Sequence, residues 1–357
     1  MTPIRLWVSN ARKRFLTPFP GPCAVAVLSI LAGAGLCSCD RRDNDPARQQ
    51  VVVYCSVDQD VAQGILKDFE KLTGIRVLTR YDEEARKTTG LVQRLRAEGD
   101  RPAADVYWSG EIFQTVRLAE EGVLAPYDGP GAKDRPTQYA DPQGRWHAFA
   151  LRQRVIAYNT RRVPAEQAPR KLEDLLQPQW KGRVVMSQPQ FGTTRGDVAS
   201  WFAHYGPKRG REILLGLKAS EVRFVQGNSL AVRKVAQGEA DVCLTDTDDA
   251  YVGQRNGWPI AMTALDQGGA GALAIPNSAA LVRGGPNPQA ARRLVEFLLG
   301  EKVEADLAVG EAHTTPVRPA VAGRFAKYAL GKALEVDYAK VAEQMAPAMS
   351  AVEEIFH

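Results

Sequence analysis

The residues from Val51 to Leu78 read VVVYC-SVDQ-DVAQGILKDFEKLT-GIRVL. The unbroken apolar runs at Val51–Cys55 and Ile75–Leu78 are typical of buried strands. Between them, apolar side chains recur at the spacing of one helix face, and Gly74 supplies a helix stop; the apolar positions are Ala62, Ile65, Leu66, Phe69 and Leu72. The stretch therefore predicts a strand, a helix and a second strand.

Units of the same kind follow along the chain. We expect a helix over 82–97, a strand at Ala104–Trp108 and a helix over Ile112–Glu121. This alternation predicts an α/β fold with a mainly parallel sheet, in which ligands bind beyond the carboxyl ends of the strands. Ser56 and Asp58 follow one such strand, and Gly110-Glu111 follow another.

A long β-like run over Arg145–Asn159 could cross between two lobes. A second α/β block comes after it, with expected strands at 183–186, 222–225 and 241–244. We expect one helix at 196–205, another that ends at about 215, and a third at 228–237. Further on, we expect a strand within 270–282 and an amphipathic helix over 286–309.

Three acids stand close together after the expected strand at 241–244. The stretch Gly238–Ala250 reads GEADVCLTDTDDA and carries Asp246, Asp248 and Asp249. Like charges at the end of an apolar strand repel one another, so either a helix start or a bound cation must compensate them. Helix capping by Asp246 or Asp248 is the structural alternative to a ligand site.

Two further segments have the residues of an anion site. Gly192-Thr-Thr-Arg195 and Asn228-Ser229 both precede or open expected helices and offer hydroxyl or amide donors. The amino-terminal end of a helix attracts anions. Capping of the two helices by Thr194 and Asn228 is the alternative, and it is compatible with anion binding.

The first 38 residues have the features of an export signal. Arg5, Lys13 and two further arginines come without an acid, and a short apolar segment, Pro20–Leu36, leads to Leu36-Cys37-Ser38-Cys39. The last four residues resemble a bacterial lipobox, which would make Cys39 the lipidated first residue of the mature protein. An ordinary secretory peptide is the alternative. Residues 39–50 are polar and suit a flexible tether.

Composition excludes several functions. Without residues 1–38 the formal charge falls from +5 to +1, so no basic surface argues for nucleic-acid binding. The mature chain would keep Cys39, Cys55 and Cys243. Cys55 and Cys243 could form a disulfide after export, but both lie in apolar runs typical of buried thiols. Motifs for phosphate-binding loops, zinc proteases and serine hydrolases do not occur.

Taken in order, six segments resemble the bacterial ferric-iron-binding family of solute-binding proteins: 54–58, 69–77, 102–108, 122–126, 238–249 and 286–291. The resemblance implies a two-lobed type II periplasmic-binding fold, each lobe a mixed, mainly parallel sheet flanked by helices, with crossing strands between them. Residues 51–145 and 262–318 would form lobe 1, and residues 146–261 and 319–357 would form lobe 2.

In many members of this family a histidine, a glutamate and two adjacent tyrosines bind the metal. The matching positions here hold Asp58, Gly110 or Glu111, and Asp248 with Asp249, so the tyrosine pair is absent. We therefore expect a metal site of Asp58, Glu111, Asp248 and Asp249, which suits a hard cation. The resemblance also implies ligand contacts, including those to a synergistic anion, from Ser56, Thr193, Thr194, Asn228 and Asp246.

The resemblance implies that the chain captures a metal ion or metal complex, with iron(III) as the family default, and is not an enzyme. An ABC permease and its ATPase would be its partners. It would be a monomer anchored through Cys39 on the periplasmic face of the cell membrane, or on the outer surface of a cell with one membrane. A small organic solute such as an aminophosphonate, a metal-dependent hydrolase, and a tethered sensor or adaptor are the alternatives.

Overall fold

The computed structural model describes residues 49–82, 89–310, 313–329 and 331–357. The expected signal peptide (1–38), the lipidation residue Cys39 and most of the expected tether (39–50) lie outside the described residues. Among the helices of the described part, none is both long enough and apolar enough for a membrane span.

The first strand-helix-strand unit forms as the sequence predicts. It consists of β1 (Gln50–Cys55), α1 (Gln59–Thr73) and β2 (Arg76–Tyr81), and β1 and β2 pair in parallel. Gly74 ends α1 with a φ of 72°, and its N–H donates to the Glu70 carbonyl at 2.8 Å. Glycine takes this left-handed conformation at little cost, which is why the helix ends there.

One part of the sheet is built around β1. Strands β2, β1 and β3 (Val106–Ser109) are parallel, and β10 (Ala274–Val282) is antiparallel to β3 and to the short β4 (Leu124–Ala125). Alternate side chains of β1 enter two different core clusters. One cluster contains α1, α7 (Pro288–Leu298) and α8 (Glu301–Val309), and the other contains α2 (Thr89–Glu98) and α3 (Phe113–Glu120).

The other part of the sheet is built around β8. Strands β6 (Val184–Ser187), β7 (Arg223–Val225) and β8 (Val242–Asp246) are parallel. One core cluster joins them to α5 (Asn228–Ala236), α6 (Thr247–Arg255) and β9 (Ile260–Ala264).

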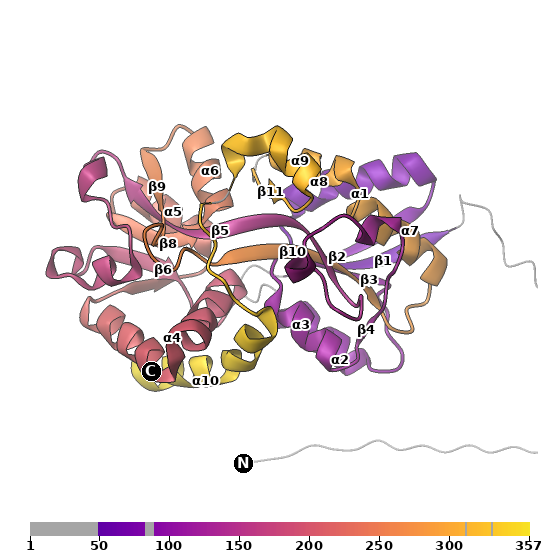
Figure 1. Ribbon diagram of the computed structural model, residues 1–357, viewed down its shortest axis with the longest axis horizontal. Helices are drawn as coiled ribbons and strands as arrows, with labels where there is room; N and C mark the ends of the chain where they lie inside the picture. Colours follow the sequence, from indigo (N-terminus) through magenta and orange to yellow (C-terminus); the bar gives the residue numbers. More distant parts are fainter. Residues whose placement is uncertain (1–48, 83–88, 311–312, 330) are drawn as a thin grey trace, which may run out of the picture. The chain divides into compact units, whose positions relative to one another are not determined.

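Strand β5 (His147–Asn159) belongs to both parts (Figure 1). Its first half pairs with β10 and with β11 (Thr315–Pro316), and its second half pairs with β8 and β9, all antiparallel. The complete order is β2-β1-β3-β10-β5-β8-β6-β7, with β4, β9 and β11 beside this path. The predicted α/β class with mixed sheets, and the predicted crossing strand, are confirmed.

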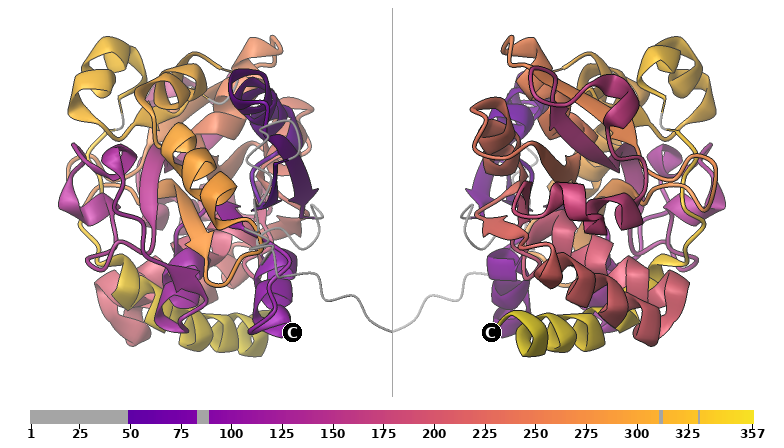
Figure 2. Two further views of the ribbon diagram at one scale, coloured as in Figure 1. Left: turned by 90° about the vertical axis from the view of Figure 1, so that its right-hand side faces the viewer. Right: turned by 90° about the vertical axis from the view of Figure 1, so that its left-hand side faces the viewer.

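Several boundaries differ from the expectations. The expected helix over 286–309 is two helices, α7 and α8, because Gly300 has an extended conformation. The segment Gly192–Arg195, expected to precede or open a helix, forms the first turn of α4 (Gly192–Ala219), whose two helical segments meet at Gly206, with a φ of 84°. Three elements were not predicted from the sequence: β9, the short α9 (Pro319–Ala322) and α10 (Tyr338–Phe356), which packs along α4 (Figure 2).

Both cysteines of the described chain are buried thiols, as the apolar runs around them predict. Cys55 lies in β1 and Cys243 in β8, and the exposed fraction of each is 0%.

Candidate functional site

A cavity of about 80 Å³ lies beyond the carboxyl ends of the strands. Its walls come from segments far apart in sequence: the turns after β1 and β3, strand β5, and the amino-terminal ends of α4, α5 and α6. Its polar lining includes Ser56, Asp58, Glu111, Arg152, Thr193, Asn228, Ser229, Asp246 and Asp249. A second cavity shares several of these residues and adds Asp60, Asp248 and Asn277.

The three acids at the end of β8 and the start of α6 converge at these two adjoining cavities. Asp246 ends β8, and Asp248 and Asp249 lie in the first turn of α6. One carboxylate oxygen of each lies within 4.8 Å of the others, which is close enough for one metal ion to bind all three. The amino-terminal end of α6 offsets part of their repulsion.

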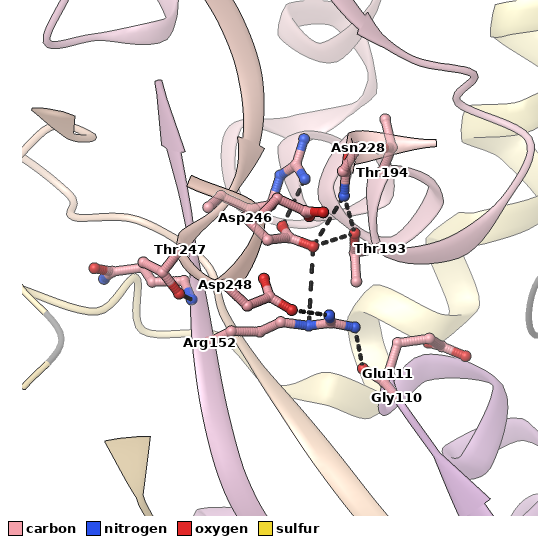
Figure 3. Close-up of polar contacts among 12 residues, drawn as sticks. Gly110, Glu111, Arg152, Thr193, Thr194, Asn228, Asp246, Thr247 and Asp248 are labelled. Atoms are coloured by element: carbon pink, nitrogen blue, oxygen red, sulfur yellow. Dashed lines mark hydrogen bonds and ion pairs between the residues drawn. The ribbon is translucent and has the colours of Figure 1, made fainter. Parts of the chain in front are cut away.

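Of the three acids, Asp246 is the one that is completely buried, and it makes the most hydrogen bonds. Its Oδ1 accepts a hydrogen bond from Arg154 Nη1 at 2.6 Å. Its Oδ2 accepts from Thr193 Oγ1 at 2.6 Å and from Asn228 Nδ2 at 3.0 Å (Figure 3). Burial alone would raise the pKa of Asp246, but the charges of Arg154 and Arg152 outweigh it and hold the pKa below its usual range. Asp246 occupies the N-cap position of α6 without making a capping hydrogen bond.

Asp248 and Asp249 are partly exposed at the cavity. Asp248 Oδ2 accepts from Arg152 Nη1 at 2.5 Å, and Asp249 Oδ1 accepts from Ser229 Oγ at 2.6 Å. Burial raises the pKa of Asp248 despite the opposing charge of Arg152. Burial and the negative charges of Asp248 and Asp246 raise the pKa of Asp249 well above its usual value. Together these acids hold negative charge that a cation would stabilise.

Glu111 lines the cavity, but the start of α3 holds its carboxylate. Its Oε2 accepts from the backbone N–H of Phe113 at 2.7 Å, and Gln114 N lies 3.3 Å from both oxygens. Burial raises the pKa of Glu111 to about 7, against the lowering effect of these N–H groups. The carboxylate of Glu111 is therefore bound by N–H groups of α3, and its assignment as a metal ligand stays a prediction.

Asp58 lies before α1, on the wall formed by the turns after β1 and β3. Its side chain is exposed and does not cap α1. Its negative charge contributes to the raised pKa of Asp248, after burial and the charge of Asp246. The structure thus brings Asp58 and the α6 acids to one cavity, and its metal role also stays a prediction.

The expected anion donors have another partner. Thr193 and Asn228 both donate to Asp246, and Thr194 Oγ1 lies 3.4 Å from Asn228 Oδ1. Ser56 Oγ accepts from the Gly110 N–H at 3.0 Å and so fastens the turn after β3. Of the expected ligand contacts, Ser56, Thr193, Asn228 and Asp246 line the cavity.

Two arginines of β5, Arg152 and Arg154, make contacts at the site that were not predicted from the sequence. Arg152 lines the cavity and contacts Asp248 and the Gly110 carbonyl. Arg154 has an exposed side-chain fraction of 0% and binds Asp197 at 2.9 Å as well as Asp246. The sequence does contain one signal for these ion pairs: two positive charges inside an otherwise apolar strand need partners of opposite charge when they are buried. Tyr54, Tyr107, Trp108 and Trp146 are buried in the core.

The cavity lies beyond the carboxyl ends of the strands, where proteins with open α/β sheets generally bind ligands. Residues 104–341 match the family of bacterial extracellular solute-binding proteins, and the chain belongs to this family. The family consists of binding proteins.

Individual relatives agree with this assignment. Iron uptake protein A1 of Synechocystis is 28% identical over 278 residues, which are 74% of this chain and 75% of that protein. The ferric binding protein from Campylobacter jejuni superimposes with a TM-score of 0.77 at 22% identity, covering 86% of this chain and 99% of that one. The periplasmic binding protein AfuA from Actinobacillus pleuropneumoniae, solved with fructose-6-phosphate bound, has a TM-score of 0.74 at 20% identity, with 86% and 97% covered. These structures share the type II periplasmic-binding fold, as predicted.

Proposed function

We propose that this chain is the capture component of an ABC importer, and that its cargo is a metal ion or metal complex, with iron(III) as the first candidate. One observation carries the proposal: oxygens of Asp246, Asp248 and Asp249 lie within 4.8 Å of one another at a cavity that Asp58 also lines. Carboxylate oxygens are the ligands that hard cations prefer. The names of Synechocystis iron uptake protein A1 and the Campylobacter ferric binding protein support iron.

Capture would follow from closure of two lobes, residues 51–145 with 262–318 and residues 146–261 with 319–357. The cavity walls come from both sets of residues, and strands β5 and β10 connect them. A ligand that contacts both walls favours the closed arrangement, which a permease can then recognise. The lipid anchor at Cys39 would keep a monomeric protein at the periplasmic face of the membrane.

The contacts of Thr193 and Asn228 favour a cation over an organic solute with an anionic group, such as an aminophosphonate. AfuA shows that the fold accommodates a sugar phosphate. In this chain, however, the two donors expected to hold such a group already donate to Asp246. An anionic group placed beside Thr193 and Asn228 would be repelled by the carboxylate of Asp246, which already accepts their hydrogen bonds.

The test is metal analysis and titration of the chain from Asp40 onward, which keeps every described residue. Iron(III) supplied as its citrate complex, together with a panel of divalent ions, should give stoichiometric binding to one metal without turnover. Asp248→Asn/Asp249→Asn should lower the affinity by more than about 100-fold, because two ligands lose their charge. Asp60→Asn is the matched control, since Asp60 lines the adjoining cavity but lies outside the cluster, and should bind like wild type.

Other results would select the alternatives. Absence of metal binding, with binding of phosphonates instead, would replace the cation by an organic solute. Hydrolysis of esters or phosphoesters in the presence of the bound metal would indicate an enzyme. Co-purification of the anchored protein without any importer permease would favour a sensor or adaptor.

A further inference from the structure

The carboxylate of Asp246 lies among donors of the kind that hold a free anion in other proteins. Thr193 Oγ1, Asn228 Nδ2 and Arg154 Nη1 donate to its two oxygens over 2.6 to 3.0 Å, and Arg152 Nε lies 3.8 Å from Oδ2. Asp246 is 0% exposed and Thr193 is 5% exposed. The donors therefore form a built, desolvated cradle around one negative charge.

Several elements aim positive charge at this cradle. Thr193 is in the first turn of α4 and Asn228 begins α5, so two helices direct their amino-terminal ends toward Asp246. Neither N-cap residue, Phe191 or Gly227, caps its helix through a side chain. Arg154, itself fully buried, adds a full charge and is held in place by Asp197.

On the basis of the proposed function, we propose that Asp246 is a built-in counter-anion, which fills the anion position beside the cargo metal so that the metal binds without a free anion from solution. Oxygens of Asp248 and Asp249 lie within 4.8 Å of an oxygen of Asp246, so its charge acts directly on a metal bound there. A second anion would have to share Thr193 and Asn228 with a carboxylate of like charge. Such crowding of like charge is unfavourable in a buried site.

The decisive variant is Asp246→Ala, which removes the carboxylate and leaves all its donors. In the metal-free state, calorimetry with formate and with inorganic phosphate should detect binding to Asp246→Ala and none to wild type. Formate should also raise the melting temperature of the variant more than that of wild type at equal ionic strength. Asp249→Ala is the matched control, because it removes a neighbouring carboxylate that pairs with Ser229 and with no described arginine, and it leaves Asp246 in its cradle. It should not bind formate.

Metal titration provides the second readout. The affinity of wild type for the metal should be the same with and without formate. Asp246→Ala should bind the metal about 10- to 100-fold more weakly, and formate should restore most of this loss. If Asp246→Ala does not fold, Asp246→Ser leaves the same donors with a smaller gap and gives the same test.

Two outcomes overturn the proposal: metal-free wild type binds formate or phosphate as well as the variant does, or added anion strengthens metal binding by wild type tenfold or more. If wild type binds no metal, the proposed function fails instead, while the anion titrations of the metal-free proteins still decide the role of Asp246.

Discussion

Arg152 Nη1 lies 2.5 Å from Asp248 Oδ2, so a positive charge of the chain itself is already inside the acidic cluster. The same guanidinium donates from Nη2 to the carbonyl of Gly110 at 2.6 Å. It thereby joins the start of α6 to the turn after β3, on the opposite wall of the cavity. If a metal ion is the cargo, Arg152 competes with it for Asp248. If an anionic solute is the cargo, Arg152 would bind it.

Replacing Arg152 separates these two cases. Arg152→Gln should strengthen metal binding by about 10-fold, because removal of one nearby charge increases the attraction of the remaining acids for a cation. Isothermal titration at neutral pH measures the change. Arg209→Gln, which removes a surface arginine paired with Glu173 and Glu212, is the control and should leave the affinity unchanged. Loss of ligand binding in Arg152→Gln would instead identify an anionic cargo.

The buried Arg154 should matter more for stability than any surface ion pair. Arg154→Met leaves Asp197 and Asp246 buried without their shared cation, which should lower the free energy of unfolding by about 3–5 kcal/mol. Urea unfolding at neutral pH measures this. Adding Asp197→Leu to Arg154→Met removes one stranded carboxylate and should restore part of the loss. A loss below about 1 kcal/mol in Arg154→Met would be typical of an exposed pair and would contradict this role.

The sequence predicted features formed by residues close together along the chain, but it did not predict contacts between distant segments. The units of β1, α1 and β2 follow from local periodicity, and the acids after β8 were visible as a cluster. The contacts of Asp246 were not, because its partners Thr193, Asn228 and Arg154 come from three other segments that only the sheet order brings together. Likewise α10 contains Pro347, a residue that argues against a helix interior, and the helix is stabilised by packing on α4.

Two glycines in helices should respond in opposite directions to the same change. A Cβ at Gly196 of α4 would overlap the ring of Phe113, which also packs against Tyr338 at a centroid distance of 6.0 Å. Gly196→Ala should therefore lower the free energy of unfolding by about 1–3 kcal/mol. A Cβ at Gly64, on the exposed face of α1, meets no heavy atom within 4 Å. Gly64→Ala should raise the free energy of unfolding by about 0.5–1 kcal/mol, because alanine favours the helix. Equal effects in urea unfolding would contradict the packing of α3 on α4.

His147 should make stability depend on pH. The imidazole is buried in β5, where its Nε2 lies 2.9 Å from the Tyr127 carbonyl, and it donates there as the neutral form. Burial, with the charge of Arg135 as a second cause, lowers the pKa of His147 from 6.5 to about 4. Because the unfolded chain takes up this proton more readily than the folded one, the contribution is complete above pH 6.5 and is lost as the pH falls toward 4.

Between pH 7 and pH 5 the loss from this one group should be about 2 kcal/mol, obtained from urea unfolding of wild type at both values. His147→Gln keeps an N–H donor for Tyr127 but cannot titrate, so its stability should fall less over the same interval. His204→Gln, which removes an exposed imidazole from α4, is the control and should keep the wild-type pH dependence. Equal slopes in wild type and His147→Gln would show that the folded protein protonates His147 as readily as the unfolded chain does.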